Sequence, residues 1–495
     1  MKTVLGIDIG TQSTKVLLYD FEDRTIVTEA SSKHSIISRK DGTKEQKVDW
    51  WITALENCLS EIEVRLRATV VAIGISGQQH GFVPLDKNGN VLYNVKLWCD
   101  TSTASECRQI TKAFGGEEKL LSEAGNLILP GYTASKVLWL KNNKPEIYRK
   151  LSTILLPHDY LNFYLTGNRV MEYGDASGTG FLDIKTRKWS RGVLKAIDPD
   201  RDLLSALPHL ISAQQPAGSL KSNIAAQLGL NPEIPVSSGG GDNMMGAIGT
   251  GTVKPGILSM SLGTSGTLYG YSEQPVIDKS LAAFCSSTNG WLPLFCTMNC
   301  TVSLELTKAL FEIDFTELEK LVSDTPIGSN GLITLPFYNG ERAPNLPNGK
   351  GCIMGLDMNN MQKNNIIRSS MEAVILGMRF GLETFKKVGF KPVEVRLTGG
   401  GSKSCTWRQI AADILNLPVV VPKTQEAAAF GAALQALWMY ENSKSKGISI
   451  HAIANRHVKL DPNKKHHPRP ESAKKYNRVY KEYLKYLNAV VDIFK

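Results

Sequence analysis

The stretch "VLGIDIGTQSTKVLLYD", Val4 to Asp20, decides the fold. A buried-looking apolar run leads into the pair Gly10 and Thr11 and a short hydroxyl-rich turn, after which a second apolar run returns. This order predicts a β-hairpin. In a P-loop or a dinucleotide-binding fold the glycine turn opens a helix instead, and the Walker pattern is also missing from the chain. The stretch therefore favours neither of those nucleotide-binding folds.

A second hairpin of the same kind follows much later, as "GILSMSLGTSGTLYGYS", Gly256 to Ser272, with Gly263 and Thr264 in its turn. Helical and strand-like segments alternate after each copy, which predicts an α/β fold. We expect two domains, 1–247 and 248–495, each founded on one hairpin and joined near the glycine-rich segment 246–256. The two glycine-threonine turns would then face each other across a cleft.

The composition is typical of a globular protein with more than one domain. The chain has 495 residues, of which 42% are hydrophobic and 21% charged. No apolar run approaches the roughly 18 residues of a membrane helix, and the first strand begins at Val4, which leaves no room for a leader. We therefore expect a cytoplasmic protein that does not bind membranes. The eight cysteines are scattered, which indicates reduced thiols; Cys296 and Cys300 could share a helix face, without forming a zinc site.

The net charge of +10 belongs to the end of the chain. Residues 441–495 contain 13 Lys and Arg against 5 Asp and Glu, or +8, which leaves +2 for the other 440 residues. Within this tail an apolar and aromatic stripe recurs at helical spacing, with basic residues between its members. This pattern favours a docked C-terminal helix over a nucleic-acid-binding arm. The stripe consists of Tyr476, Tyr480, Tyr483, Leu487, Val490 and Phe494.

The two turns and a third glycine cluster predict a polyphosphate ligand. A Gly-Thr turn exposes backbone N–H groups and a hydroxyl, which suit phosphate oxygens, and Gly399 to Gly401 follow the strand-like "EVRL". One such turn alone would be an ordinary hairpin, but the three together point to ATP. Asp8 stands immediately before the first turn, where a carboxylate could help to hold Mg²⁺. The alternative role for Asp8 is to cap the turn.

Two further segments supply acid-base and polar groups. In "SSGGGDNMMGA" three glycines precede Asp242 and Asn243, so Asp242 is a candidate base for an attacking alcohol, or an aspartate in a glycine-rich turn without a partner. In "GISGQQHGFVPLD" the residues Gln78, Gln79 and His80 follow a buried strand. Amide and imidazole groups at a strand end can bind sugar hydroxyls, although a single histidine is more often structural.

Together these residues resemble the FGGY family of carbohydrate kinases. "GYTASKVLWLKNN", residues 131–143, fits the first signature of that family and "GCIMGLDMNNMQKNNIIRSSME", residues 351–372, fits the second. The resemblance spans nearly the whole chain. It implies two actin-like ATPase domains, which are ribonuclease H-like, flanking a nucleotide and sugar cleft.

The resemblance also implies roles for individual residues. Asp242 would be the base, Asp8 would organise the metal, and the sugar would contact Gln79, His80, Asp242 and Asn243. The nucleotide would be surrounded by Gly10, Thr11, Lys15, Gly263, Thr264, Gly400, Gly401 and Ser404. Three positions depart from relatives: Ser102 stands where many have arginine, Ser404 where asparagine is common, and Lys15 where glycerol kinases have arginine.

The expected reaction is ATP- and Mg²⁺-dependent phosphorylation of a pentulose, with D-xylulose as the sugar. The stretch Gln78 to Gly81 is similar to the branch of the family that uses D-xylulose, and the arginine-glutamate pair of glycerol kinases is missing. Another ketose such as D-ribulose, or an actin-like ATPase without a sugar acceptor, are the alternatives. No nucleic-acid partner is expected. A homodimer is compatible with the sequence, which does not determine the oligomeric state.

Overall fold

The computed structural model describes residues 1–445 and 447–494, and these form two compact units. The first unit contains residues 1–253, 272–293 and 426–458; the second contains 254–271, 294–425 and 459–495. The chain first passes between the units after Val253, inside the glycine-rich segment at which we predicted the domains to join. Two later segments, 272–293 and 426–458, return to the first unit.

The first unit is founded on a seven-stranded sheet within the described residues. The hairpin β1–β2 and the next strand β3 are antiparallel, whereas β6 runs parallel to β1, and β15 and β16 run parallel to β6. The sheet comprises β14 (Gly218–Ser219), β15 (Pro235–Val236), β6 (Val70–Gly77), β1 (Thr3–Ile9), β2 (Ser13–Asp20) and β3 (Thr25–Lys33), with β16 (Gly240–Gly241) also on β6.

The second unit repeats this plan with a six-stranded sheet. Its hairpin β17–β18 and strand β19 are antiparallel, and β22 and β23 continue in parallel from β17. The order is β19 (Leu294–Thr297), β18 (Gly266–Gly270), β17 (Ile257–Leu262), β22 (Glu394–Thr398), β23 (Val419–Pro422) and β24 (Leu460–His466). The predicted α/β fold, with one hairpin at the base of each of two sheets, is confirmed.

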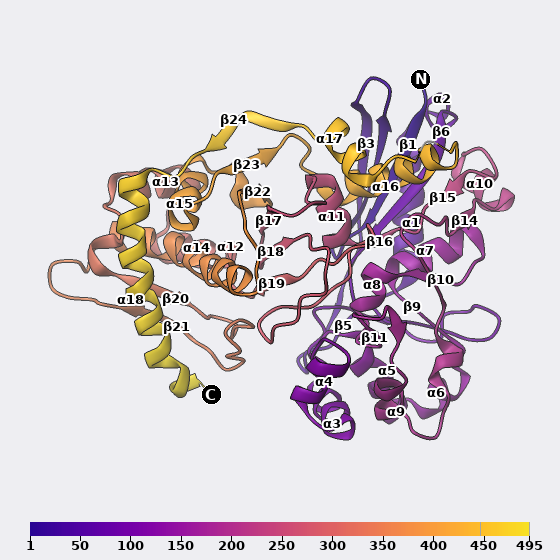
Figure 1. The fold of residues 1–495 in the computed structure, drawn as a ribbon, viewed down its shortest axis with the longest axis horizontal. Helices are drawn as coiled ribbons and strands as arrows, with labels where there is room; N and C mark the ends of the chain where they lie inside the picture. The colour runs from indigo at the N-terminus through magenta and orange to yellow at the C-terminus, as the bar shows by residue number, and fades with distance from the viewer. Residues whose placement is uncertain (446, 495) are drawn as a thin grey trace. The chain divides into compact units, whose positions relative to one another are not determined.

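The strands of the first unit bury different residue types on their two faces. Leu5, Ile7 and Ile9 of β1 point into a hydrophobic core shared with helices α1 (Val48–Ser60), α7 (Pro157–Thr166) and α10 (Ser222–Leu228). Gly6 faces the other way, towards helix α16 (Ala427–Asn442), which lies along β1 and β6 (Figure 1). Because side chains alternate along a strand, Asp8 shares the face of Gly6.

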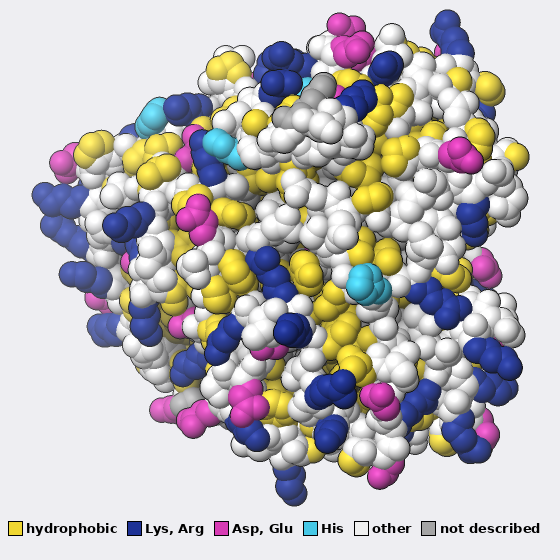
Figure 2. Space-filling view, turned by 45° about the vertical axis from the view of Figure 1, so that its right-hand side comes forward, with side chains coloured by type: hydrophobic (Ala, Val, Ile, Leu, Met, Phe, Trp, Pro, Cys, Tyr) yellow, Lys and Arg dark blue, Asp and Glu magenta, His cyan; other side chains and the backbone are white. Residues whose placement is uncertain are grey.

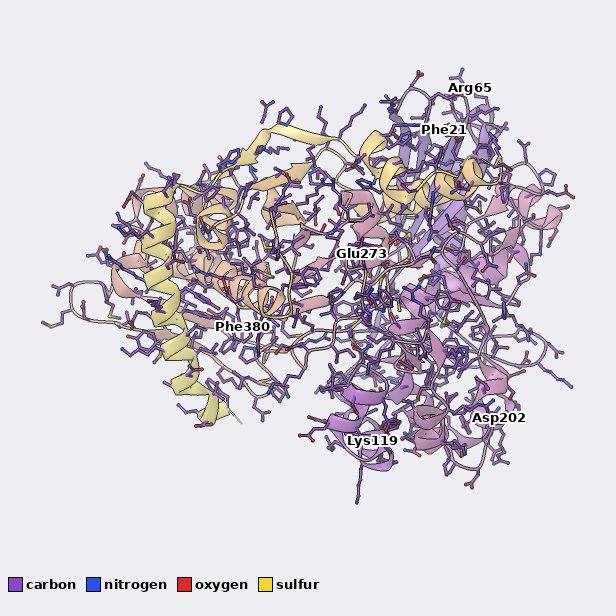
Figure 3. All side chains as sticks on the ribbon, viewed as in Figure 1. Phe21, Arg65, Lys119, Asp202, Glu273 and Phe380 are labelled. Atoms are coloured by element: carbon purple, nitrogen blue, oxygen red, sulfur yellow. The ribbon has the colours of Figure 1, made fainter. Side chains whose placement is uncertain are left out.

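Helix α16 approaches its neighbours at backbone distance. A Cβ atom on Gly6 would lie 2.0 Å from the carbonyl oxygen of Ala429, and one on Gly431 would lie 1.7 Å from that of Met245. Met245 belongs to α11 (Asp242–Thr250). At the far end of α16 the ring of Tyr440 lies 6.1 Å from that of Phe21, in the turn after β2 (Figure 3). Glycine is therefore required at positions 6 and 431.

The remaining elements of the first unit include several helices that share a second hydrophobic core, further short helices and several short sheets. The helices are α2 (Val64–Arg67), α3 (Ala104–Phe114), α4 (Glu117–Glu123), α5 (Thr133–Asn143), α6 (Pro145–Lys150), α8 (Tyr173–Ser177), α9 (Arg191–Ile197), α17 (Ile450–His457) and the 3₁₀ turn Leu203–Ala206. The strands are β4 (Ile37–Ser38), β5 (Lys44–Gln46), β7 (Val83–Leu85), β8 (Val95–Lys96), β9 (Thr153–Leu155), β10 (Val170–Glu172), β11 (Leu182–Asp183), β12 (Lys188–Trp189) and β13 (His209–Ile211).

Helices of the second unit pack on its sheet, and the last of them is the predicted C-terminal helix. The elements are α12 (Thr301–Phe311), α13 (Phe315–Asp324), β20 (Ile333–Pro336), β21 (Gly351–Met354), α14 (Lys363–Lys387), α15 (Cys405–Leu415), α18 (Pro470–Phe494) and 3₁₀ turns at Ser329–Gly331 and Gly400–Lys403. Helix α18 buries the stripe from Tyr476 to Val490, while its lysines face outward. On the face drawn in Figure 2, Lys and Arg side chains are spread over the surface, and acidic side chains lie between some of them.

One expectation from the sequence is wrong. Cys296 and Cys300 do not share a helix, because Cys296 lies in β19 and Cys300 precedes the first residue of α12. Among the described residues, no helix is long and apolar enough to cross a membrane.

We predict that Gly431→Ala destabilises the protein by about 1–3 kcal/mol, because the added methyl group would meet the Met245 carbonyl oxygen at backbone distance. Gly377→Ala is the matched control, since Gly377 lies inside α14 and its nearest neighbour is the Tyr483 hydroxyl, 3.8 Å from the new Cβ. The control should gain up to about 1 kcal/mol from helix propensity. Urea unfolding of both variants provides the measurement, and equal stabilities would contradict the close packing.

Candidate functional site

The candidate catalytic residues lie at one edge of the sheet in the first unit. Strands β1, β6 and β16 run in parallel, with Asp8 opposite Ser76 and Gly241 opposite Gly77. Asp8 is therefore close to the carboxyl end of β1, Gln79 follows the end of β6, and Asp242 follows the end of β16. Ligands of α/β sheets commonly bind at this edge, and the structure brings together the residues that the sequence predicted for the base, the metal and the sugar.

Asp8 is a carboxylate that forms a hydrogen bond but no ion pair among the described residues. Its Oδ1 atom accepts a hydrogen bond of 2.7 Å from the Ser76 hydroxyl. Lys15 is its partner across the hairpin, yet the Lys15 ammonium pairs with Glu426 at 2.5 Å, and Asp8 forms no ion pair within residues 1–445 and 447–494. Burial raises the pKa of Asp8, against the lowering effects of the Ser76 hydrogen bond and the Lys15 charge.

Asp242 opens helix α11 and is held by the backbone and the side-chain amide of Asn243. Its Oδ1 atom accepts from the Asn243 backbone N–H at 2.8 Å and from Asn243 Nδ2 at 3.1 Å. The same Nδ2 donates to Gln79 Oε1 at 2.9 Å. Burial, followed by the negative charge of Asp8, raises the pKa of Asp242 to about 7. A carboxyl group with this pKa is suited to accept a proton at neutral pH.

These residues fit a Mg²⁺ ion that is bound largely by water and phosphate. Asp8 and Asp242 are two partly exposed carboxylates whose pKa values are both raised, and the charge of Asp8 contributes to the shift of Asp242, so a divalent cation bound near them would relieve their repulsion. No cluster of three or more His, Cys, Asp or Glu side chains suitable for a metal occurs in the described part of the chain. The donor set thus suits a metal that arrives with a phosphorylated ligand and does not form a closed protein cage.

His80 is fixed in an unusual backbone conformation. Its φ angle is 63°, its Nδ1 lies 2.5 Å from the Gly178 carbonyl oxygen, and its ring stacks on Tyr132 at 4.5 Å. The ammonium of Lys136, which is fully buried, donates to the His80 carbonyl oxygen at 2.6 Å. Burial lowers the pKa of Lys136 to about 7. These contacts fix both the backbone and the ring plane of His80 just after the end of β6.

The first glycine-threonine turn is a tight connection with an anchored hydroxyl. The Gly10 N–H donates to the Ser13 carbonyl oxygen at 3.0 Å. Thr11 Oγ1 accepts from the Trp98 indole N–H at 2.9 Å and donates to Gln78 Oε1 at 3.3 Å. Gln78 is fully buried and its side chain supports the turn, so the ligand contact that its sequence position suggested is not available to it.

In the second unit, the other glycine-threonine turn and the glycine cluster lie together. A Cβ atom on Gly399 would be 2.6 Å from the Leu262 carbonyl oxygen, directly before Gly263. A Cβ atom on Gly400 would meet nothing within 4 Å, so the backbone there borders open space. Thr264 accepts at its carbonyl oxygen from the N–H of Cys300, at 3.0 Å. The open glycine backbone suits the approach of a large ligand.

Ser404 differs from these residues because its hydroxyl is already engaged. It caps α15 by accepting from the Trp407 N–H at 2.9 Å, it donates to Glu319, and only 1% of its surface is exposed. A nucleotide contact at Ser404 would have to use its backbone.

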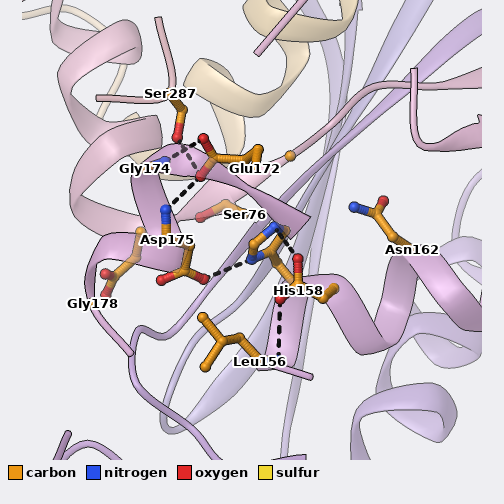
Figure 4. A network of polar contacts seen from close by, with 12 residues as sticks. Ser76, Leu156, His158, Asn162, Glu172, Gly174, Asp175, Gly178 and Ser287 are labelled. Carbon is orange, nitrogen blue, oxygen red and sulfur yellow. Dashed lines mark hydrogen bonds and ion pairs between the residues drawn. The ribbon is translucent and has the colours of Figure 1, made fainter. Parts of the chain in front are cut away.

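A buried charged cluster beside Asp242 was missed by the sequence reasoning (Figure 4). His158 Nδ1 lies 2.7 Å from Asp175 Oδ2, and Nε2 lies 2.9 Å from Asp159 Oδ1, with all three side chains at 0% exposure. The carboxylate of Glu172 caps the start of α8 by accepting the N–H groups of Gly174 and Asp175, both at 2.6 Å. The available signal was ionisable residues inside the apolar stretch "LLPHDYLNFYLTG".

We predict that this cluster makes stability depend on pH. Although burial lowers the pKa of His158, the charges of Asp159 and Asp175 outweigh it and hold the pKa well above 6.5. The folded state then keeps a proton that the unfolded chain releases, so this stabilisation is complete below about pH 6.5 and is lost as the pH rises through the folded pKa, by up to about 1.4 kcal/mol per unit. The gap in melting temperature between wild type and His158→Gln should narrow from pH 7 to 9; a constant gap would contradict a charged His158.

The sequence matches family models and curated relatives over most of its length. Residues 3–249 match the FGGY family of carbohydrate kinases, N-terminal domain, and residues 258–440 match the C-terminal domain of the same family. A xylulose kinase of Haemophilus influenzae is 44% identical over 98% of this chain and 99% of its own.

Solved structures are similar over the full length. The ligand-bound xylulose kinase from Lactobacillus acidophilus has a TM-score of 0.91 and 25% identity, covering 100% of this chain and 99% of its own. A gluconate kinase from the same organism has a TM-score of 0.90 and 26% identity, with the same coverage. The two family matches together span most of the sequence, and the expectation drawn from the two signatures is confirmed: the chain belongs to the FGGY family of carbohydrate kinases.

Proposed function

We propose that this carbohydrate kinase converts D-xylulose to D-xylulose 5-phosphate with ATP as the phosphoryl donor. The observation that carries the proposal is the Asp242 carboxylate, which is oriented by Asn243 and Gln79 and has its pKa raised to about 7 beside Asp8. The choice of sugar is supported by the 44% identity to a xylulose kinase along essentially the whole chain.

In the proposed reaction the terminal sugar hydroxyl attacks the γ-phosphorus of ATP. A new oxygen–phosphorus bond forms, the bond from the γ-phosphorus to its bridging oxygen breaks, and ADP leaves with that oxygen. The hydroxyl proton passes to Asp242 Oδ2, because Oδ1 already accepts two hydrogen bonds from Asn243. General-base assistance and alignment of the hydroxyl are the contributions that phosphoryl transfer requires from these side chains.

Asp8 is the proposed metal-organising residue. Bound Mg²⁺ would neutralise charge on the phosphate oxygens. Ser76 orients the Asp8 carboxylate by donating to Oδ1 at 2.7 Å, which leaves Oδ2 available. Because Lys15 stands opposite Asp8 in the hairpin but pairs with Glu426, a phosphate group could attract the Lys15 ammonium without breaking a contact to Asp8.

The proposed nucleotide contacts come from three glycine-containing turns. In the first unit they are Gly10, Thr11 and Lys15; in the second they are Gly263, Thr264, Gly400, Gly401 and Ser404, the last through its backbone. The open space above Gly400 supports this role. We also keep the cytoplasm as the proposed location, and 1–247 and 248–495 as the proposed domains.

The acceptor sugar is the part of the proposal for which a second candidate exists. A gluconate kinase is as similar in fold as a xylulose kinase, and D-ribulose differs from D-xylulose only in configuration at C3. An actin-like ATPase without an acceptor would have no use for Gln79 and Asn243 beside a base. The proposed sugar-reading groups are His80, Gln79 and Asn243.

We predict that Asp242→Asn lowers kcat by about a hundredfold or more, the scale expected for loss of a general base. The dissociation constants for sugar and nucleotide should change little, because Asn preserves the shape of the side chain. Steady-state kinetics and isothermal titration calorimetry provide the two measurements. A kcat within about tenfold of wild type would exclude Asp242 as the base.

We further predict that kcat/KM is highest for D-xylulose among xylulose, ribulose, fructose, gluconate and glycerol, measured through ADP release. His80→Ala should reduce the preference for xylulose over ribulose by about ten- to hundredfold, because an unpaired buried polar group costs about 1–3 kcal/mol. Greater activity on ribulose or gluconate would change the assigned substrate, whereas ADP release that ignores every sugar would favour the ATPase.

A further inference from the structure

The buried cluster next to the base has a defined direction of hydrogen bonding. His158 faces carboxylates with both ring nitrogens, Asp175 on Nδ1 and Asp159 on Nε2 (Figure 4). The Nδ1 contact is a hydrogen bond, whereas Nε2 and Asp159 Oδ1 lie within ion-pair distance but form no hydrogen bond among the described residues. Because Nδ1 faces a carboxylate, which can only accept, Nδ1 carries the hydrogen of that bond. Asp175 accepts with Oδ2, at 2.7 Å, and presents Oδ1 to the opposite side.

The cluster lies directly against the glycine segment 239–241, which leads into Asp242. A Cβ atom on Gly239 would lie 2.9 Å from His158 Cδ2. A Cβ atom on Gly241 would lie 3.0 Å from Asp175 Oδ1 and 2.6 Å from Gln79 Cγ. These glycines therefore allow His158, Asp175 and Gln79 to touch the backbone that leads into the base, and they place Asp175 and Gln79 on the same side of Gly241.

Asp175 Oδ1 and Gln79 Nε2 are complementary atoms in this space. Both are buried and neither has a hydrogen-bond partner within the described residues, yet the Gln79 amide is near enough to lower the pKa of Asp175. On its other side Gln79 accepts with Oε1 from Asn243 Nδ2, and Asn243 donates with that atom to Asp242 Oδ1. A carboxylate, two carboxamides and a second carboxylate thus follow one another.

We propose that Asp175 is a positioning residue for phosphoryl transfer, which sets the orientation of the Gln79 and Asn243 amides and thereby directs the Asn243 donor onto Asp242. This inference rests on the proposed function of Asp242. A carboxylate can only accept, so Asp175 requires the NH₂ end of Gln79 to face it. Gln79 must then turn its oxygen to Asn243, and Asn243 must turn its NH₂ group to Asp242, whose Oδ2 stays available for the sugar proton.

Asp175 acts through its neighbours and not on the substrate. Its side chain has 0% exposure, and its two oxygens face His158 and the Gln79 side of Gly241. The ring of His158 has a matching task, because its Nδ1–H requires an acceptor and so fixes which oxygen of Asp175 points to Gln79.

Exchange of the two functional groups tests the proposed direction. In Asp175→Asn, the His158 donor holds the amide oxygen, so the new NH₂ group faces the NH₂ group of Gln79. Gln79→Glu instead places two acceptors opposite each other. Each single variant should lose about tenfold or more in kcat.

The double variant, Asp175→Asn with Gln79→Glu, restores a donor opposite an acceptor. The amide introduced at position 175 donates to the carboxylate introduced at position 79, and that carboxylate still accepts from Asn243. The double variant should therefore recover about tenfold or more in kcat relative to both single variants.

The measurements are kcat and KM for sugar and ATP, with melting temperatures for every variant. The KM for ATP should stay within about twofold in the whole set, because no residue changed is a proposed nucleotide contact. Asp413→Asn is the matched control: Asp413 is also a fully buried aspartate, paired with Arg469 at 2.6 Å, but it lies in the second unit. It should lower the melting temperature and leave kcat within about twofold.

A double variant that folds and is no more active than the single variants would overturn the proposal, as would full activity in Gln79→Glu. If Asp175→Asn does not fold alone, the kcat of the double variant is compared with that of Gln79→Glu. A folded double variant with the higher kcat supports the proposal, and a folded double variant without a higher kcat overturns it. If the proposed function is wrong, the wild-type protein will show no activity on D-xylulose, which distinguishes that failure from a failure of this inference. The single and double variants are therefore compared on whichever sugar in the panel gives the highest kcat/KM.

Discussion

Repulsion between carboxylates that are held away from water is the constraint on which this molecule depends. Asp8 and Asp242 each lie at the end of a parallel strand, and burial raises the pKa of both, with the charge of Asp8 adding to the shift of Asp242. Asp175 and Glu172 are two further acids, both fully buried, and the charge of Asp175 also helps to raise the pKa of Asp242. Such an arrangement is stable only if nearby cations, hydrogen-bond donors or bound protons compensate the negative charges. The neighbouring elements provide such groups.

The internal duplication shows that the two units differ in these charged groups. In the first hairpin Asp8 is opposite Lys15, whereas at the corresponding place in the second hairpin Ser261 is opposite Thr267. Both copies retain the glycine-threonine turn and the same order of strands. The scaffold is therefore repeated, but the two charged residues that face each other across the hairpin are present only in the first unit, where the metal and the base are proposed. The neutral copy can serve as a support for ligand binding through its backbone.

The sequence was sufficient for those features that are written in local patterns. The two hairpins, the strand before Gln78 and the helix with the stripe from Tyr476 to Val490 follow from periodicity. The glycine segment before Asp242 indicated a candidate base, whose role stays a proposal. Asp175 and His158 could not be found in this way, because their importance lies in contacts across 17 positions of chain and in the burial of both. The lack of a shared helix for Cys296 and Cys300 likewise follows from the start of α12, which residue spacing does not reveal.

The return of segment 426–458 to the first unit has a consequence for how the protein is made. Helix α16 packs against Gly6 and Gly74, yet it is synthesised long after both of them, because it begins only at Ala427. Until that helix leaves the ribosome, the face of the sheet that carries Asp8 lacks its cover, and strands β1 and β6 expose glycine-containing backbone. Contacts of such long sequence separation form slowly. The first unit can therefore complete its fold only after helix α16, which ends at Asn442, has been synthesised.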